Sequence, residues 1–263
     1  WTFEGNFEGD NARNGCQDTL NKPLYELMVR ITDSIRQVDQ NHIIFIEGNC
    51  WANNFNGMTP PWDDNMVYSF HKYWNPNNQQ AIQQFLDMRE KYNIPLWLGE
   101  TGENSNTWYT NCIRLLDYHK IGWAWWPEKQ LGDQNNPLTV RMNSGYRELL
   151  DYWSNGGQKP DVQFAKDALM QLTENLKLEN CIYNKDVIDA MFRQTKTTET
   201  KPYKELAFPG KVYAVDYDMG RVQHAYYDQD YSNTDFRGPT NRGGAYRNDG
   251  VDIEECEDNM TNG

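Results

Sequence analysis

The stretch that decides the fold is Leu96-Trp97-Leu98-Gly99-Glu100-Thr101-Gly102-Glu103. It is a short apolar run that ends on a carboxylate, with small residues beside it that leave room for a ligand. Such runs are typical of parallel strands buried on both faces. We therefore predict a strand over residues 94–99 with Glu100 at its carboxyl end. An N-cap or ion-pairing role for Glu100 stays open, and Glu103 is a rival carboxylate, expected in the first turn of the next helix.

Apolar runs and helical periodicities alternate on either side of this stretch. The runs predict further strands near residues 42–47, 66–70 and 121–126. Helical spacing of apolar residues predicts helices near residues 24–38, 79–92, 107–119 and 144–153. Alternating strands and helices indicate parallel βα units, so the expected fold class is α/β. Four strands fit an open sheet or half of a (β/α)8 barrel, and the lack of a Gly-rich phosphate loop disfavours a nucleotide-binding open sheet.

The carboxyl ends of the predicted strands carry polar and aromatic residues. In a barrel these ends hold the catalytic candidates. Glycoside cleavage needs two carboxyl groups that flank the bond, which makes Glu100 a candidate. His71 and Tyr73 stand two residues apart, so an extended backbone points them the same way. They are suited to bind sugar hydroxyls or to orient a carboxylate, although a purely structural histidine is an alternative.

Aromatic residues are abundant, with 10 Trp and 16 Tyr in the chain. Trp and Tyr combine a flat apolar face with a polar edge, which suits sugar rings, although aromatic residues also build cores. Strand alternation leaves at most two of Trp123, Trp125 and Trp126 for a sugar platform. The net charge of −13 argues against nucleic acid and against an anionic membrane surface as partners.

Cysteines and chain ends bear on the compartment and on completeness. The five cysteines form no Cys-x-x-Cys pair, which disfavours a zinc ribbon, and their odd number leaves at least one thiol without a partner in the chain. No run of 18 apolar residues is present. We recognise no signal peptide within this stretch, and we expect the true N-terminus to lie upstream of Trp1. Because the chain begins at Trp1 and stops at Gly263, we expect a fragment cut at both ends.

The pattern changes after residue 157. Apolar residues predict two helices near residues 161–178 and 185–194, and a polar linker follows at 195–201. Residues 209–256 are rich in Tyr, Asp, Asn and Gly and show no helical period. We expect short strands and loops of an all-β module there.

Four motifs in the first part carry a resemblance to a known family. They are His42-Ile-Ile-Phe-Ile-Glu-Gly, Val67-Tyr-Ser-Phe-His-Lys-Tyr-Trp, Ile94-Pro-Leu-Trp-Leu-Gly-Glu-Thr-Gly-Glu and Gly122-Trp-Ala-Trp-Trp-Pro-Glu-Lys. Together they resemble glycoside hydrolase family 5, whose members are (β/α)8 TIM barrels. The motifs match strands five to eight of that barrel in order. The resemblance covers about residues 1–155 and implies the C-terminal half of a barrel.

The resemblance also implies roles for particular residues. Glu100 matches the family's catalytic nucleophile. His71 and Tyr73 match the His-x-Tyr of the subsite next to the scissile bond. Trp126 matches the tryptophan platform after strand eight, with Trp125 as the alternative. No metal or cofactor takes part.

The departure from the family concerns the second carboxylate. The family's acid/base glutamate lies in an Asn-Glu-Pro motif, which this sequence lacks. Glu4 and Glu8 lie in the opening loop without that motif, so neither takes the role. We expect the acid/base upstream of Trp1, and little or no hydrolysis by this chain alone.

The C-terminal part resembles a second family. The segments Pro209-Gly-Lys-Val-Tyr-Ala-Val-Asp-Tyr-Asp, Ala225-Tyr-Tyr-Asp-Gln-Asp and Ala245-Tyr-Arg-Asn-Asp-Gly-Val-Asp-Ile are similar to the start of a carbohydrate-binding module of family 6, a β-sandwich. Tyr246 is the matching ligand-stacking residue, although a core tyrosine is the alternative. Tyr213 and Val215 stand where acidic or amide ligands of a structural calcium are expected, which makes calcium doubtful, although Asp216 and Asp218 remain.

We therefore expect three parts. Residues 1–157 form half of a (β/α)8 barrel, residues 158–201 a helical bridge and linker, and residues 202–263 a truncated β-sandwich. The expected activity is retaining hydrolysis of a β-linked glucan by a secreted, cellulase-like enzyme, with β-glucan as ligand and no protein partner implied. A mannanase or xylanase, a non-catalytic glycan-binding protein, and an open-sheet hydrolase based on Glu103 are the alternatives.

Overall fold

The computed structural model describes residues 14–228, 246–251 and 253 of the 263-residue chain. The chain divides into two compact units. The first comprises Trp1–Gly102 and Cys112–Trp126, and the second comprises Glu103–Asn111 and Pro127–Gly263. The predicted boundary at residue 157 falls within the second unit.

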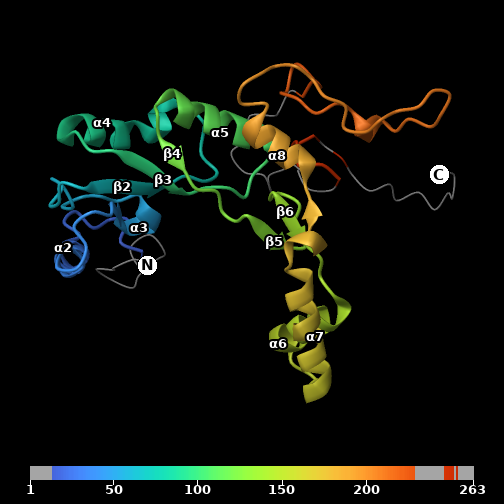
Figure 1. The fold of residues 1–263 in the computed structure, drawn as a ribbon, viewed down its shortest axis with the longest axis horizontal. Helices are drawn as coiled ribbons and strands as arrows, with labels where there is room; N and C mark the ends of the chain where they lie inside the picture. Colours follow the sequence, from blue (N-terminus) through green and yellow to red (C-terminus); the bar gives the residue numbers. More distant parts are fainter. Residues whose placement is uncertain (1–13, 229–245, 252, 254–263) are drawn as a thin grey trace. The chain divides into compact units, whose positions relative to one another are not determined.

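A four-stranded parallel sheet forms the centre of the first unit (Figure 1). Its strands lie side by side in the order β1, β2, β3, β4, and the bounds are Ile44–Glu47, Met66–His71, Leu96–Glu100 and Gly122–Trp123. The predicted α/β fold with parallel strands is thereby confirmed. The predicted strand at 121–126 is shorter in the structure, because regular pairing with β3 stops at Trp123 and resumes only as an isolated bridge between Gly102 and Trp126.

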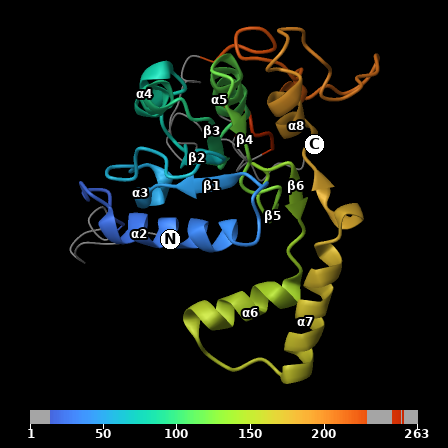
Figure 2. The same cartoon turned by 60° about the vertical axis from the view of Figure 1, so that its left-hand side comes forward.

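Helices connect and cover these strands (Figures 1 and 2). They are α2 (Lys22–Arg36), the single turn α3 (Asn49–Ala52), the 3-10 turn η1 (Gln79–Ile82) leading into α4 (Gln83–Tyr92), and α5 (Asn106–Tyr118). The helix α4 ends where Asn93 adopts a left-handed conformation with φ 52°. Each long helix agrees with the predicted positions to within about two residues.

The hydrophobic core of the first unit lies between β2, β3 and their helices. Its most deeply buried members include Tyr68, Phe70, Ile82, Leu98 and Leu116. Phe70 stacks on Phe85 of α4 with ring centroids 4.1 Å apart. Burial of such side chains is the main source of folding free energy.

Two apolar surfaces of the first unit are not fully covered within the described residues. Phe45 on β1 is 50% exposed, and Ile43 just before the strand is 53% exposed. The apolar stripe predicted on α2 buries Leu24, but Ile31 is 45% exposed. The predicted helix is therefore present, and its apolar positions are buried only in part.

The second unit contains a small mixed sheet, three α-helices and two short 3-10 turns in its described residues. The strands β5 (Lys129–Leu131) and β6 (Leu138–Val140) are parallel, and β7 (Ile182–Tyr183) is antiparallel to β6. Figure 2 shows α6 (Ser144–Asn155) and α7 (Val162–Asn175) joined by a loop. The chain continues through η2 (Leu178–Asn180) to α8 (Lys185–Phe192) and η3 (Ala214–Asp216). The helices predicted near 161–178 and 185–194 are present.

The all-β module predicted for residues 202–263 is not confirmed. Its described residues, 202–228, 246–251 and 253, hold no strand, only η3 and isolated bridges such as that between Val222 and Tyr226. Side-chain hydrogen bonds, rather than paired strands, connect these residues. Arg247 donates to the carbonyl oxygens of Tyr217 and Asp218. Residues 229–245 and 254–263, including Cys256, lie outside the described part.

Among the residues that the structure describes, no helix combines the length and apolarity that a membrane span requires.

Candidate active site

The candidate site lies at the carboxyl edge of the four-stranded sheet. The last residues of β1, β2 and β3 are Glu47, His71 and Glu100. Strands in a parallel sheet bring these ends to one edge, which is where open and closed α/β folds place their ligands. All three residues belong to the first unit.

His71 lies between two carboxylates. Its Nε2 is 3.1 Å from Glu47 Oε1, within hydrogen-bonding geometry, and its Nδ1 is 3.3 Å from Glu100 Oε2. The second contact has ion-pair distance but not hydrogen-bond geometry, and Nδ1 is buried without a hydrogen bond. The His71 side chain is 14% exposed, against 49% for Glu47 and 33% for Glu100. The structure thus brings His71 and Glu100 into contact, while the roles expected of them stay predictions.

A register shift creates this arrangement. Ser69 pairs with Trp97 and Phe70 with Leu98, but His71 pairs with Glu100, so that β3 carries one extra residue between the last two pairs. An extra residue of this kind turns the following side chains relative to the partner strand. Without the shift, alternation would place Glu100 and His71 on opposite faces.

Gly99 is the extra residue, and its lack of a side chain is required. A Cβ at this position would lie 2.1 Å from Ser69 Oγ and 3.1 Å from Glu47 Oε1. Ser69 Oγ itself donates to Glu47 Oε1 at 3.2 Å. Gly99 thus leaves space for the Ser69–Glu47 contact directly beside the nucleophile candidate.

Glu47 was predicted at a strand end, among the candidate positions, but no role was predicted for it. Its place at a strand end was visible in the sequence, but its contacts depend on the strand register. The hydrogen bond with His71 is the largest influence and lowers the pKa of Glu47, while desolvation acts in the opposite direction. The carboxylate is therefore held in its ionised form beside the imidazole.

The loop after β2 presents Tyr73 and is anchored by a buried lysine. The Lys72 ammonium group donates to Asn75 Oδ1 at 2.6 Å and to Asn77 Oδ1 at 2.7 Å. Burial lowers the pKa of Lys72 to about 8. Tyr73 follows on this loop, and its ring centroid lies 5.5 Å from that of Trp74, which is half-exposed. The loop thus holds aromatic rings next to His71.

Trp126 is fixed at the same edge after β4. Its backbone N–H donates to the Thr101 carbonyl at 2.7 Å, and its side chain is 52% exposed. Gly102 has φ 146°, and a Cβ there would lie 2.0 Å from the Trp126 carbonyl oxygen. Trp125 instead packs edge-on against Trp123 with centroids 5.4 Å apart. Trp126 is the indole better placed to offer a stacking face.

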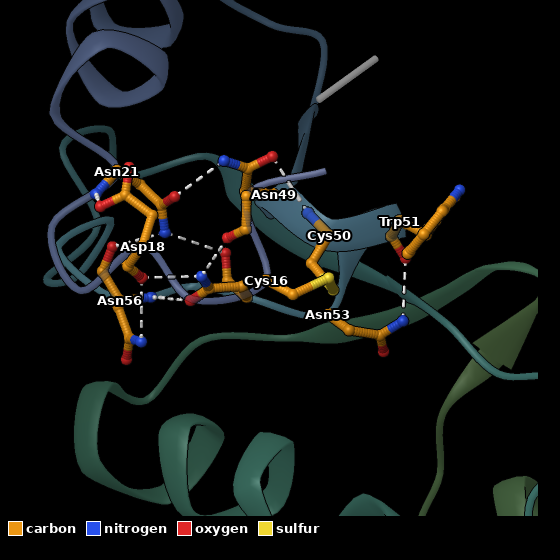
Figure 3. Close-up of a disulfide and its surroundings, with 10 residues drawn as sticks. Cys16, Asp18, Asn21, Asn49, Cys50, Trp51, Asn53 and Asn56 are labelled. Atoms are coloured by element: carbon orange, nitrogen blue, oxygen red, sulfur yellow. Dashed lines mark hydrogen bonds between the residues drawn. A yellow bond between two sulfur atoms is a disulfide. The ribbon is translucent and has the colours of Figure 1, made fainter. Parts of the chain in front are cut away.

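A further exposed indole, Trp51, follows β1 and was not predicted as a site residue. Figure 3 shows it pointing away from the disulfide between Cys16 and Cys50. Asn53 Nδ2 donates to the Trp51 carbonyl, and residues 50–52 all have positive φ, a conformation rarely adopted by residues other than glycine. No sequence signal pointed to this conformation.

Asparagines hold the disulfide loop in place (Figure 3). Asn54 Nδ2 donates to the Gly15 and Asp18 carbonyl oxygens at 2.8 Å each, and Asn49 Nδ2 donates to Asn21 Oδ1 at 2.9 Å. Cys112 and Cys181 are free thiols in the described part of the chain.

Glu103 does not occupy the position predicted for it. The helix α5 begins at Asn106, and Glu103 precedes it with a left-handed φ of 50°. It belongs to the second unit and is not a first-turn residue. The polar Asn104-Ser105-Asn106 segment delays the helix, because such side chains compete for backbone hydrogen bonds. Because α5 begins at Asn106, Glu100 lies too far before the helix to be its N-cap.

Tyr246 belongs to the second unit. Its hydroxyl donates to Asp216 Oδ1 at 2.6 Å, and its ring lies edge-on to Tyr203 at 5.9 Å. Lys204 Nζ is 3.0 Å from the same Asp216 oxygen. These contacts fix the Tyr246 ring, and its role as a stacking residue stays a prediction.

Of the two carboxylates considered for a structural calcium, Asp216 has protein partners, and calcium stays a prediction. Asp216 is already engaged by Lys204 and Tyr246. No cluster of three or more His, Cys, Asp or Glu side chains with metal-binding geometry occurs in residues 14–228, 246–251 and 253.

Comparison with known families identifies the region that holds this edge. Residues 6–130 match the family model of cellulase, glycosyl hydrolase family 5. The region that the cellulase family model matches contains Glu47, His71, Glu100 and Trp126, and thus the whole carboxyl edge described above. No curated protein matches the chain.

Solved structures similar to the chain are cellulases and endoglucanases. Cel5A from Thermotoga maritima with cellobiose is 19% identical, with 40% of this chain and 46% of that chain covered and a TM-score of 0.35. An endo-beta-1,4-glucanase from Xanthomonas axonopodis pv. citri is 14% identical over 58% and 54%, with a TM-score of 0.37. The cellulase Cel5C_n is 17% identical over 58% and 48%, with a TM-score of 0.40. The chain spans about half the length of these structures.

Proposed function

We propose that the region matched by the cellulase family model supplies the nucleophile half of a retaining β-glycoside hydrolase that acts on a β-1,4-linked glucan. The observation that carries this proposal is the contact between His71 and Glu100 at the carboxyl edge of a parallel sheet, inside the segment that matches the cellulase family. In this proposal the four strands are strands five to eight of a (β/α)8 barrel.

Glu100 acts as nucleophile in the proposed reaction. One of its carboxylate oxygens forms an ester bond to the anomeric carbon while the bond to the leaving oxygen breaks. A second carboxyl group donates a proton to that oxygen and then takes a proton from the water that hydrolyses the ester. Retention requires the two carboxyl groups about 5–5.5 Å apart. We assign this second group to no residue of the chain.

The aromatic residues at the same edge hold the sugar. Trp126 offers a stacking face, and Trp51 and Trp74 are further exposed indoles after β1 and β2. Stacking on such rings and hydrogen bonds from Tyr73 orient the glycan over Glu100, and His71 positions the Glu100 carboxylate. Tyr246 is the proposed ligand-stacking residue of an attached glycan-binding module, which raises the local substrate concentration.

A secreted protein is also proposed. The disulfide between Cys16 and Cys50 supports this, because disulfides persist in oxidising compartments.

An activated substrate tests the proposal without the second carboxyl group. Dinitrophenyl 2-deoxy-2-fluoro-β-cellobioside has a leaving group that departs as the phenolate and needs no protonation. We expect the chain to release dinitrophenolate once and to retain a fluorocellobiosyl ester on Glu100, detected by intact mass and peptide mapping.

Two variants make the labelling experiment decisive. Glu100→Gln should not be labelled, whereas Glu90→Gln, the same change on the exposed face of α4, should be labelled like the parent. An ester on another residue would contradict the assignment of Glu100. Tight cellobiose binding without any labelling would favour a non-catalytic glycan-binding protein, and preferential labelling by the matching mannoside or xyloside would replace glucan as the substrate.

A further inference from the structure

We propose that Glu47 is a positioning residue. It fixes the orientation and the tautomer of His71, and through His71 the position of the Glu100 carboxylate. This inference rests on the proposed function only where it concerns Glu100 as nucleophile. Its structural part, the control of His71 by Glu47, can be tested without any reaction.

The contacts of Glu47 converge on one oxygen. Oε1 accepts from Ser69 Oγ at 3.2 Å and lies 3.1 Å from His71 Nε2. The strand register places Glu47 opposite Ser69, so both donors come from β2 and meet the carboxylate at the end of β1. Two such contacts restrict the rotation of the Glu47 side chain, which is otherwise half-exposed.

Gly99 shows that space is kept for this arrangement. A Cβ there would approach both Ser69 Oγ and Glu47 Oε1, the two atoms that form the anchor. The residue immediately before the candidate nucleophile is thus the one residue type that leaves the Ser69–Glu47 contact undisturbed. Glu47 comes from β1, Ser69 and His71 from β2, and Gly99 from β3.

The chemistry of imidazole gives this anchor its consequence. A neutral imidazole carries its proton on one nitrogen, and the hydrogen bond made by the other atom decides which. Glu47 is an obligate acceptor, so it holds a proton on Nε2. In the neutral ring Nδ1 then carries no proton. It presents its lone pair to Glu100 Oε2, which lies 3.3 Å away. A carboxylate that orients a functional histidine in this way is a common supporting element.

Nitrogen chemical shifts of His71 test the structural part directly. The chain has four histidines, and the His71 signals are those lost in His71→Gln. In ¹⁵N-edited spectra of the full chain we expect the parent to show the proton on Nε2. We expect Glu47→Ala to show a mixture of tautomers, and Glu47→Gln, which keeps an acceptor oxygen, to stay closer to the parent. Unchanged His119 signals verify that the first unit remains folded.

Labelling kinetics test the catalytic part. With the fluorocellobioside described above, Glu47→Ala should label Glu100 on the order of 10-fold to 100-fold more slowly than the parent, because small misplacements of reacting groups have effects of this size. Glu90→Gln is the matched control. If His71 keeps its parental nitrogen shifts in Glu47→Ala, the positioning role is wrong. If the shifts change but the parent chain is never labelled, the positioning role stands and the proposed function fails.

Discussion

His71 presents Nδ1 to Glu100 at 3.3 Å and Nε2 to Glu47 at 3.1 Å. One imidazole therefore joins the last residues of β1 and β3 across β2. Because the ring contacts both carboxylates, any change to it alters both.

Replacing His71 should alter the titration of Glu47. The hydrogen bond from His71 lowers the pKa of Glu47 below its ordinary value of 4.5. A lowered folded-state pKa contributes stability above that ordinary value, and the contribution is lost as the pH falls through the folded-state pKa. We expect His71→Gln to raise the pKa of Glu47 and to remove this part of the acid sensitivity. Carboxyl ¹³C titration measures it, and an unchanged Glu47 titration would contradict the contact.

Gly99→Ala should destabilise the first unit and a second change should rescue it. The new Cβ would lie 2.1 Å from Ser69 Oγ, and overpacking of this kind costs about 1–3 kcal/mol. Removing the hydroxyl in Ser69→Ala eliminates that collision. Urea unfolding of the two single variants and the double variant gives the coupling free energy. Additive losses, with no recovery in the double variant, would show that the collision does not determine the effect.

Lys72 should make stability rise with pH in a defined window. Burial lowers its pKa from 10.5 to about 8, so between these values the unfolded chain holds a proton that the folded chain has lost. Stability therefore increases as the pH rises through this window, and the cost of burying the charge is fully present below it. Between about pH 7.5 and 9.5 the parent should gain on the order of 2 kcal/mol over Lys72→Met. Lys22→Met, at an exposed position, should follow the parent.

The disulfide should stabilise the loop that carries Trp51. Cys16 and Cys50 are 34 residues apart, and closing a loop of this length contributes about 2–4 kcal/mol. We expect Cys50→Ser to lower the free energy of unfolding by that amount. Cys181→Ser removes a free thiol and should leave stability almost unchanged. Equal unfolding midpoints for the parent and Cys50→Ser would contradict a stabilising role.

Trp126 should contribute to glycan affinity. Loss of a stacked indole removes about 0.5–1.5 kcal/mol beyond its buried area, so Trp126→Ala should weaken cello-oligosaccharide binding several-fold. Trp153→Ala, which removes an equally exposed indole from α6, is the control. Titration calorimetry compares the two, and equal losses would show that Trp126 has no special place in binding.

The sequence was sufficient for the parallel strands of the first unit and for placing His71 and Glu100 at strand ends. Continuous apolar runs and helical periods are local signals. The carboxyl ends of parallel strands lie at one edge of the sheet whatever the strand register. The contacts of Glu47 with Ser69 and His71 follow from the regular register of β1 and β2. The approach of His71 to Glu100 was not predictable, because it depends on a one-residue register shift at Gly99. Trp51 was missed because its exposure follows from positive φ angles at three successive residues. The strands β5, β6 and β7, two or three residues long, are too short to show alternation.

The uncovered apolar residues Ile43, Phe45 and Ile31 affect how the chain behaves in concentrated solution. Apolar surface of this kind favours self-association, while a net charge of −13 keeps copies apart. Salt shortens the range of that repulsion to about 10 Å at 0.1 M, so raising the ionic strength removes the opposing force and leaves the attraction. Purification and the measurements proposed above are therefore best carried out in dilute buffer, and light scattering should record larger particles as salt is added.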